Sequence, residues 1–293
     1  MVELVPPHGS LSLLPLSVSK DKCIQLDKEI DRLTHIPITS REKSDLLLLA
    51  MGAYTPLRGF MGLADWKSVC ESMVLKSGIF WPIPITISVS ENVADDIMIG
   101  DEVVLIDPSE NNLPMGILLV IEKYLPDKEL ECGRVFGTLE KTHPGVAKVF
   151  AQGPINLGGE LTVIDEGRFP DLYKDHYFRP EDSRALFQSL GWSVVAAFNT
   201  RNPMHRGHEH LVRNCLELAD GIFIHQVLGE LKSGDIPADV RIKAVDILVK
   251  NYLPTDKVIQ AGYPIEMRYA GPREALLHAL IRQNYGCSHL IVG

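Results

Sequence analysis

The sequence has 293 residues, a formal net charge of −9, and 45% hydrophobic and 23% charged residues. This composition is typical of a globular protein, and the length is sufficient for a large core divided between two domains. The negative charge argues against general binding to nucleic acid or anionic membranes, which needs an extended basic surface. The five cysteines are scattered and form no Cys-x-x-Cys pair, so neither a disulfide framework nor a zinc site is indicated.

The N-terminal residues lack the basic start and apolar core of a signal peptide. No run approaches the roughly twenty apolar residues of a membrane span. We therefore expect a cytoplasmic protein.

Short strands separated by turns dominate residues 1–170. An apolar run at 45–51 predicts a short helix that ends near Gly52. The sequence predicts four strands after it, at 81–89, 102–106, 115–124 and 161–164. The pattern indicates a β-barrel-like domain with a few helices. Considered alone, the segments 54–61 and 143–145 are typical of loop structure rather than of a chemical site.

The domain boundary is predicted within the charged, proline-containing stretch 165–180, which divides the chain into domains 1–170 and 171–293. Strands and helices alternate beyond it. A helix opens at Pro180, and the predicted elements that follow are strands at 194–198, 221–228, 258–262 and 288–292 and helices after Pro203, at 237–252 and at 273–284. Alternation of this kind predicts right-handed crossovers and a parallel sheet, in which ligands bind at the carboxyl ends of the strands.

The most informative stretch is 199–209, which follows the buried strand at 194–198. Pro203 suits the first turn of a helix, and apolar residues keep helical spacing from there up to Gly221. A polar turn would then lead into the positive end of a helix dipole. Such a terminus is suited to binding phosphate.

The side chains of this stretch suit nucleotide chemistry. His205 and His208 are three residues apart and share a face of the first helical turn. Arg201 and Arg206 are permanent cations that match tetrahedral oxyanions, and Gly207 allows close approach to the backbone. Three neutral side chains add hydrogen-bonding groups: Asn199, Thr200 and Asn202.

Candidates outside this stretch are weaker. Lys232 follows a predicted strand and either reaches a phosphate or is a solvated loop lysine. We expect Arg241 to pair with Asp239 or Asp235 near a helix surface.

Arg268 and Arg273 precede or open a helix, in a geometry that an anion could use. His225 lies in an apolar strand and is expected to be a satisfied core histidine.

The stretch 199–209 carries the His-x-x-His element of the nucleotidylyltransferase superfamily, and its longer form, Thr-Arg-Asn-Pro-Met-His-Arg-Gly-His-Glu, resembles the ATP sulfurylase (sulfate adenylyltransferase) family. Further segments resemble the N-terminal domain of that family (54–61, 81–85 and 142–146) and its catalytic domain (228–235 and 267–274). The resemblance implies an α/β protein in which an N-terminal PUA-like β-barrel domain precedes a Rossmann-like parallel-sheet nucleotidyltransferase domain.

Two features depart from the family pattern. The family usually has Gln where this chain has Asn199, which keeps the amide but shortens its reach by one methylene. The family also continues after Gly293 with Arg-Asp-His-Ala-Gly, so the catalytic domain is expected to be incomplete on its C-terminal side.

The resemblance implies the reversible reaction of ATP with sulfate to give adenosine 5'-phosphosulfate and pyrophosphate, by direct in-line attack of sulfate on the α-phosphate. It implies Mg²⁺ as the companion of ATP, no metal site on the protein, no nucleic-acid or membrane partner, and a homo-oligomer, a dimer. The residues implied to be catalytic are Thr200, Arg201, Asn202, His205 and His208. Those implied to bind ATP or sulfate are the same five together with Asn199, Gly207 and Lys232.

Two alternatives remain open at this point. The His-x-x-His element does not specify the acceptor, so another adenylyl- or cytidylyltransferase is possible, although a cation at Arg201 suits a small dianion. A non-catalytic protein that uses the PUA-like barrel to bind RNA is the second alternative, and the net charge of −9 argues against it.

Overall fold

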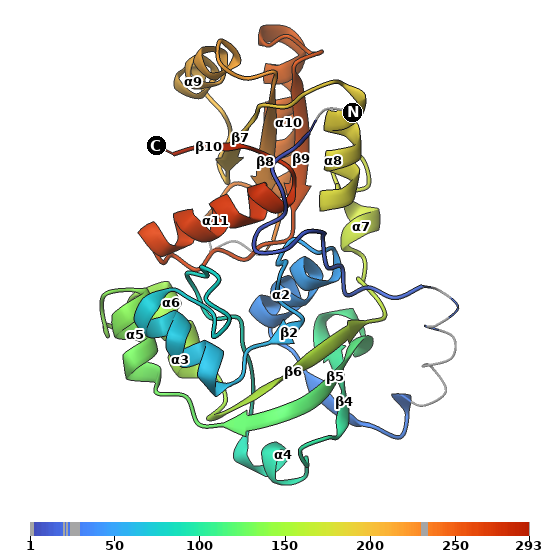
Figure 1. The fold of residues 1–293 in the computed structure, drawn as a ribbon, viewed down its shortest axis with the longest axis vertical. Coiled ribbons are helices and arrows are strands. Elements are labelled where there is room, and N and C mark those ends of the chain that lie inside the picture. The colour runs from blue at the N-terminus through green and yellow to red at the C-terminus, as the bar shows by residue number, and fades with distance from the viewer. Residues whose placement is uncertain (1–2, 20, 22, 24–29, 230–233, 293) are drawn as a thin grey trace.

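The chain folds into two halves that are stacked along its long axis (Figure 1). The computed structural model describes residues 3–19, 21, 23, 30–229 and 234–292. Within these residues no helix combines the length and the apolar character needed to cross a membrane.

The N-terminal half is built on a six-stranded sheet with the order β1-β4-β5-β6-β2, in which β3 also pairs with β6. Its strands are β1 (Thr34–Pro37), β2 (Gly59–Phe60), β3 (Ile87–Val89), β4 (Glu102–Asp107), β5 (Leu113–Tyr124) and β6 (Ile155–Val163). β1 and β4 are parallel, and the other pairs are antiparallel. The predicted strand-rich N-terminal half is confirmed.

Short helices surround this sheet: α2 (Ser40–Ala50), α3 (Leu63–Ser72), α4 (Glu91–Asp95), the 3₁₀ turn η1 (Pro108–Glu110), α5 (Lys128–Val135) and α6 (Pro144–Ala151). α2 covers residues 45–50 of the helix predicted at 45–51, but it begins earlier, at Ser40. Thr39 caps its N-terminus, and the Glu42 side chain completes a capping box. His143 likewise caps α6, as expected of a residue with a structural role.

Two predicted strands of the N-terminal half have different bounds. Only Ile87–Val89 of the strand expected at 81–89 joins the sheet, because Pro82 and Pro84 have no N–H to donate to a neighbouring strand. The strand expected at 161–164 begins earlier, at Ile155. It includes Gly159, where a Cβ would lie 1.9 Å from the Leu119 carbonyl oxygen, so only glycine fits between the strands.

The C-terminal half is an α/β unit, as predicted. After α7 (Phe169–Leu172) and α8 (Pro180–Ser189), a four-stranded parallel sheet has the order β10-β7-β8-β9. Its strands are β7 (Val195–Thr200), β8 (Gly221–Val227), β9 (Val258–Tyr263) and β10 (His289–Ile291), and its helices are α9 (Arg206–Leu216), α10 (Ala238–Tyr252) and α11 (Pro272–Asn284).

Helices cover both faces of this sheet. Val212 of α9 and Val245 of α10 pack on one face, whereas Phe187 of α8 and Leu277 of α11 pack on the other. β7 is followed in the chain by β8, which pairs with one edge of β7; the last strand, β10, pairs with the other edge of β7. The connections therefore diverge between β7 and β10, and the crevice outside the carboxyl ends of these two strands is the expected ligand position.

The prediction that Pro203 opens a helix running to Gly221 is wrong at both ends. α9 starts at Arg206, with His205 as its N-cap, because the two histidine side chains provide the capping hydrogen bonds. The helix ends at Leu216, and Gly221 is the first residue of β8.

The two halves share one hydrophobic core, which contains Leu47 and Trp81 from the first and Tyr263 and Ile265 from the second. Buried and partly buried ion pairs reinforce the contact through the segment 264–271, which follows β9. Arg268 pairs with Asp45 of α2. Glu266 lies 2.5 Å from Lys148 Nζ and 3.4 Å from Arg41 Nε. This segment is therefore fixed between the sheet and the N-terminal half.

Candidate active site

The turn after β7 is shaped by the Thr200 hydroxyl. This side chain is 7% exposed; its Oγ1 accepts a hydrogen bond from the Asn202 N–H at 3.1 Å and donates one to the Asn202 carbonyl at 2.8 Å. Met204 is also buried and joins the core beneath α9. The loop between β7 and α9 is thus held at both of its ends by its own side chains.

His205 and His208 form a stacked pair, with ring centroids 3.9 Å apart. His205 Nδ1 accepts from the Gly207 N–H at 3.1 Å, and His208 Nδ1 accepts from the His205 N–H at 3.2 Å. A nitrogen that accepts a hydrogen bond carries no proton, so in the neutral rings the proton is on Nε2. Both imidazoles can therefore donate from Nε2 to a ligand.

The His208 ring is partly enclosed by Phe198, which meets it edge to face at 5.5 Å. Burial, and next the nearby His205, lower the pKa of His208. The neutral form that caps the helix is therefore favoured. The N–H groups of His205 and Gly207 lie at the helix terminus that the sequence predicts to bind phosphate, but in the structure they donate to the two imidazoles.

Arg201 leaves the same loop and lies against Tyr269 of the segment 264–271. Its guanidinium lies 5.4 Å from the ring centroid, and Nη1 lies 3.3 Å from the Tyr269 hydroxyl and 3.8 Å from Asp235 Oδ2. The Arg201 side chain is 29% exposed. The guanidinium is thus positioned by neighbours yet open to an anion from solvent.

Asn199 is half-buried at the end of β7, and its amide is oriented by two donors. Its Oδ1 accepts from Arg282 Nη2 at 2.6 Å and from the Tyr263 hydroxyl at 3.1 Å. Because both neighbours donate, the amide oxygen must face them. Nδ2, at the other end of the planar amide, is left as the group available for a ligand.

Five other predicted roles differ from the structure or lie outside the described residues. Lys232 falls outside the described residues. Arg241 is not at a surface: it is 1% exposed, and it donates to the Val227 carbonyl at 2.6 Å and the Ile236 carbonyl at 2.9 Å, because the helix packs directly on the end of β8.

Arg268 and Arg273 do not form the anion site that the sequence suggested. Arg268 is 5% exposed and pairs with Asp45. Arg273 donates to three backbone carbonyls of the N-terminal half, those of Val69, Cys70 and Pro82. Both cations are therefore used to join the two halves.

His225 is a core residue, as predicted, but it is not satisfied. It is fully buried among Phe223, Tyr263 and Tyr285. Among the described residues, neither ring nitrogen has a hydrogen-bond partner of normal geometry. Burial lowers its pKa well below the usual value, which keeps the ring neutral.

Sequence reasoning missed a polar stripe on α11. Glu274, His278 and Arg282 are all at least 95% buried and lie four residues apart, so they share one helical face. The spacing was visible in the sequence, but three polar residues at helical intervals normally mark a solvated face. Only the packing of α11 on the sheet shows that they are inside.

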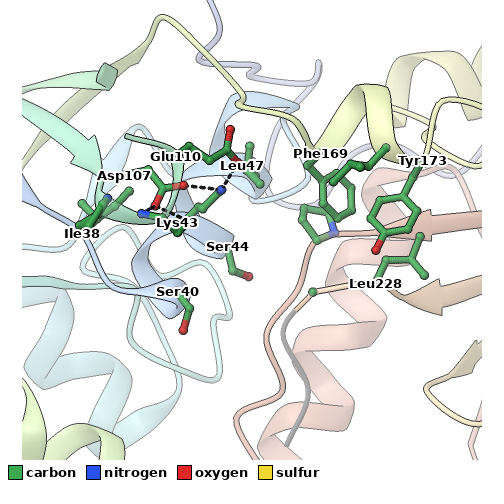
Figure 2. A pocket seen from close by; sticks show the side chains of 15 residues that line it. Ile38, Ser40, Lys43, Ser44, Leu47, Asp107, Glu110, Phe169, Tyr173 and Leu228 are labelled. Carbon is green, nitrogen blue, oxygen red and sulfur yellow. Dashed lines mark hydrogen bonds and ion pairs between the residues drawn. The ribbon is translucent and has the colours of Figure 1, made fainter. Parts of the chain in front are cut away.

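A cavity of about 390 Å³ lies between the two halves (Figure 2). Lys43, with its ion pairs to Asp107 at 2.5 Å and Glu110 at 2.6 Å, lines one side, and Phe169 and Tyr173 line the other. None of the residues 199–208 lines it. The site assembled by the loop after β7 is therefore separate from this cavity.

No group of three His, Cys, Asp or Glu side chains in the described part of the chain is arranged to hold a metal ion. The site's charge comes from Arg201 and the neighbouring buried Arg282, and its neutral donors from imidazoles and an amide. This set suits oxyanions rather than metal cations.

Comparison with known proteins agrees with this chemistry. Residues 174–293 match the ATP-sulfurylase family model, and residues 5–166 match that of the PUA-like domain. A sulfate adenylyltransferase of Syntrophobacter fumaroxidans is 55% identical over 100% of this chain and 72% of its own length. Another, from Chlorobaculum tepidum, is 51% identical over 99% of this chain and 72% of its own length.

A solved structure, the hexameric APS kinase from Thiobacillus denitrificans, matches 99% of this chain and 53% of its own chain with a TM-score of 0.79 and 25% identity. The predicted combination of a PUA-like domain with an α/β nucleotidyltransferase-like domain is thereby confirmed. The half of the chain that carries the His205–His208 pair is the half that matches the catalytic family. By its similarity over the whole length, this chain belongs to the ATP sulfurylase family of sulfate adenylyltransferases.

Proposed function

We propose that this sulfate adenylyltransferase transfers the adenylyl group at the loop 199–208. The stacked His205–His208 pair beside Arg201 supports the assignment most directly. The two imidazole Nε2–H groups and the partly exposed Arg201 guanidinium are donors for the phosphates of ATP and for sulfate. The reaction is ATP plus sulfate to adenosine 5'-phosphosulfate plus pyrophosphate, and it is reversible.

Sulfate would be held by the Arg201 guanidinium and the Asn199 amide, in line with the α-phosphorus. Its oxygen attacks phosphorus and pyrophosphate leaves, so the bond to the bridging oxygen breaks as the new P–O bond forms. His205 and His208 donate to the oxygens on which negative charge accumulates. Positioning and charge stabilisation are sufficient for this class of transfer, and no covalent intermediate is needed.

The remaining loop residues would support this arrangement. Thr200 and Asn202 would orient sulfate and the α-phosphate together with Arg201, on a turn that the Thr200 hydroxyl holds. Gly207 would allow the nucleotide to approach the backbone beside the histidines. Lys232, outside the described residues, is proposed to reach the phosphates. Mg²⁺ would enter with ATP as the magnesium complex of the substrate, carried on phosphate oxygens.

We further infer a division into domains 1–170 and 171–293, close to the two regions that match family models. A cytoplasmic location is supported by five free cysteines. A homo-oligomer, a dimer, is proposed as the assembly, and the related APS kinase is described as hexameric. Light scattering of the purified protein distinguishes a monomer, a dimer and a hexamer.

The deciding experiment measures pyrophosphate release from MgATP with and without sulfate or its analogue molybdate. The wild-type chain should release pyrophosphate only with the oxyanion, and Arg201→Ala should abolish that dependence. His205→Ala and His208→Ala should lower kcat more than they raise KM, because their bonds strengthen in the transition state. Unchanged kcat with a raised KM would contradict the assigned role of the histidines.

The two alternatives have distinct outcomes. ATP binding without oxyanion-dependent release would point to a transferase with another acceptor. Filter binding of RNA would point to a PUA-type RNA-binding protein. The cation–π contact that positions Arg201 favours the sulfate assignment over both, since it holds a single guanidinium where a small dianion would bind.

A further inference from the structure

A buried cation lies directly beneath the site. Arg282, on α11, is 1% exposed, yet its guanidinium is surrounded by neutral groups. Nη2 donates to Asn199 Oδ1 at 2.6 Å, Nη1 to His278 Nδ1 at 3.1 Å, and the Tyr263 ring centroid lies 4.2 Å away. In the described part of the chain, no carboxylate forms an ion pair with Arg282, although buried charges are normally paired.

The hydrogen-bond directions in this cluster are fixed by its chemistry. Burial, and next Arg282, lower the pKa of His278 far enough to keep it neutral, so Nδ1 accepts the Arg282 bond. Burial raises the pKa of Tyr263 to about 12, so its hydroxyl keeps its proton; the oxygen lies 3.1 Å from Asn199 Oδ1 and 3.0 Å from His278 Nδ1. Because the single lone pair of Nδ1 already accepts from Arg282, the Tyr263 proton is directed at Asn199. His278 Nε2 faces the Glu274 carboxylate at 3.9 Å. Every described donor near the Asn199 oxygen is therefore directed at it.

We propose that Arg282 is a positioning residue for the oxyanion: it fixes the Asn199 amide with Nδ2 facing the substrate, and its unpaired charge is balanced when the dianion binds. This inference rests on the proposed function of the loop 199–208. Tyr263 is the second donor to the amide, and His278 fixes the guanidinium from below. The Asn199 side chain, one methylene shorter than the Gln usual in the family, is thus held in one orientation, with Nδ2 toward the substrate.

The site gains specificity from this arrangement. A free Asn side chain can present either its oxygen or its nitrogen to a ligand, and only the nitrogen attracts an anion. Two donors on Oδ1 exclude the wrong orientation. The buried positive charge favours an acceptor with negative charge over a neutral one, because its field is little screened.

The test compares Asn199→Ala, Arg282→Met and the double variant by steady-state pyrophosphate release with varied sulfate and varied MgATP. Each single change should raise the KM for sulfate about tenfold, the factor equivalent to about 1.4 kcal/mol. The KM for MgATP should stay within about twofold of wild type. The double variant should be no worse than Asn199→Ala, because Arg282 acts through that amide. Arg282→Lys, which keeps the charge, should recover part of the loss.

Arg184→Met is the matched control. Arg184 is also a partly buried arginine that donates to carbonyls of the last turn of α11, those of Gln283 and Asn284, but it does not contact Asn199. The Arg184→Met variant should be less stable than the wild type, without a selective change in the KM for sulfate. If Arg282→Met does not fold, Tyr263→Phe removes one donor and should raise the KM for sulfate about threefold, again only when Asn199 is present.

The inference would be overturned by single effects that multiply in the double variant, or by equal increases in both KM values. A wild-type KM for sulfate in Arg282→Met would also overturn it. Failure of the proposed function would appear as an unchanged sulfate dependence in Arg201→Ala. Among the described residues, Arg201 bonds to Tyr269 and Asp235 rather than to Arg282 or Asn199.

Discussion

Replacement of Asp45 by asparagine tests the contact between the two halves. The Asp45 carboxylate is 2% exposed and pairs with Arg268, which is 6% exposed. It also accepts a hydrogen bond from the Tyr54 hydroxyl at 3.1 Å. Asp45→Asn keeps the shape and removes the charge, so the buried Arg268 loses the carboxylate with which it forms its ion pair. Arg41, another buried cation nearby, adds to the repulsion.

Removing one partner of a buried pair typically costs about 3–5 kcal/mol, and the remaining amide oxygen places Asp45→Asn near 3 kcal/mol. With a slope of about 3 kcal/mol per M of urea, the unfolding midpoint should fall by about 1 M. Tryptophan fluorescence reports the transition, since Trp66 and Trp81 lie in the core and Trp192 is also buried.

The control is Glu209→Gln on the surface of α9. Glu209 pairs with Arg213 at 2.9 Å, four residues on, and the Arg213 side chain is half exposed. Such pairs contribute at most about 0.5 kcal/mol. If Asp45→Asn and Glu209→Gln shift the midpoint equally, the reasoning about the buried pair is refuted. Asp45→Asn should also raise the KM for sulfate, because Arg268 precedes the tyrosine that positions Arg201.

Three further predictions concern the site and the core. Gly207→Ala places a Cβ 3.0 Å from the His205 ring, so kcat should fall on the order of tenfold. Calorimetry should show unchanged or higher stability, since alanine favours the helix by about 1 kcal/mol. An unchanged kcat would contradict the assigned ring position. His225→Phe removes two buried nitrogens that have no hydrogen-bond partner of normal geometry among the described residues. It should raise the unfolding free energy by up to about 1 kcal/mol in urea titrations, and a lower unfolding free energy would contradict this. The pKa values of His208, His225 and His278 are all lowered by folding, so each histidine contributes stability that declines as the pH falls below about 6.5. Below that pH His225→Phe should lose less stability than the wild type in a pH series of urea titrations, and parallel losses would refute the assignment for His225.

The sequence was sufficient to locate the loop after β7 and the alternation of strands and helices around it. Both are local patterns: a buried strand, a polar turn and an amphipathic helix occupy adjacent residues. The start of α9 was misplaced because His205 and His208 cap the helix, a role that sequence rules assign to Ser, Thr, Asp or Asn.

The roles of the other arginines could not be read in the same way. Arg268 and Arg273 precede or open a helix, where an anion site is a reasonable expectation, and the sequence predicts that Arg241 pairs with Asp239 or Asp235. Their partners are carbonyls and a carboxylate brought in from other segments, and for Arg268 the partner is 223 residues away. Sequence spacing contains no information about such partners, so the buried cation Arg282 was missed for the same reason.

Residues near the start of the chain contact helices that come late in the chain, among them the last helix, α11. The Val5 carbonyl accepts from Arg184, and the His8 N–H donates to Asn284 Oδ1 across a separation of 276 residues. Asn284 in turn donates to the carbonyls of Ala53 and Thr55. During synthesis, the apolar surface around α2 therefore remains partly exposed until α11 has left the ribosome and can pack against it. Contacts this distant in sequence slow folding and prolong the exposure of apolar surface. We therefore expect a chaperone to raise the yield of folded protein.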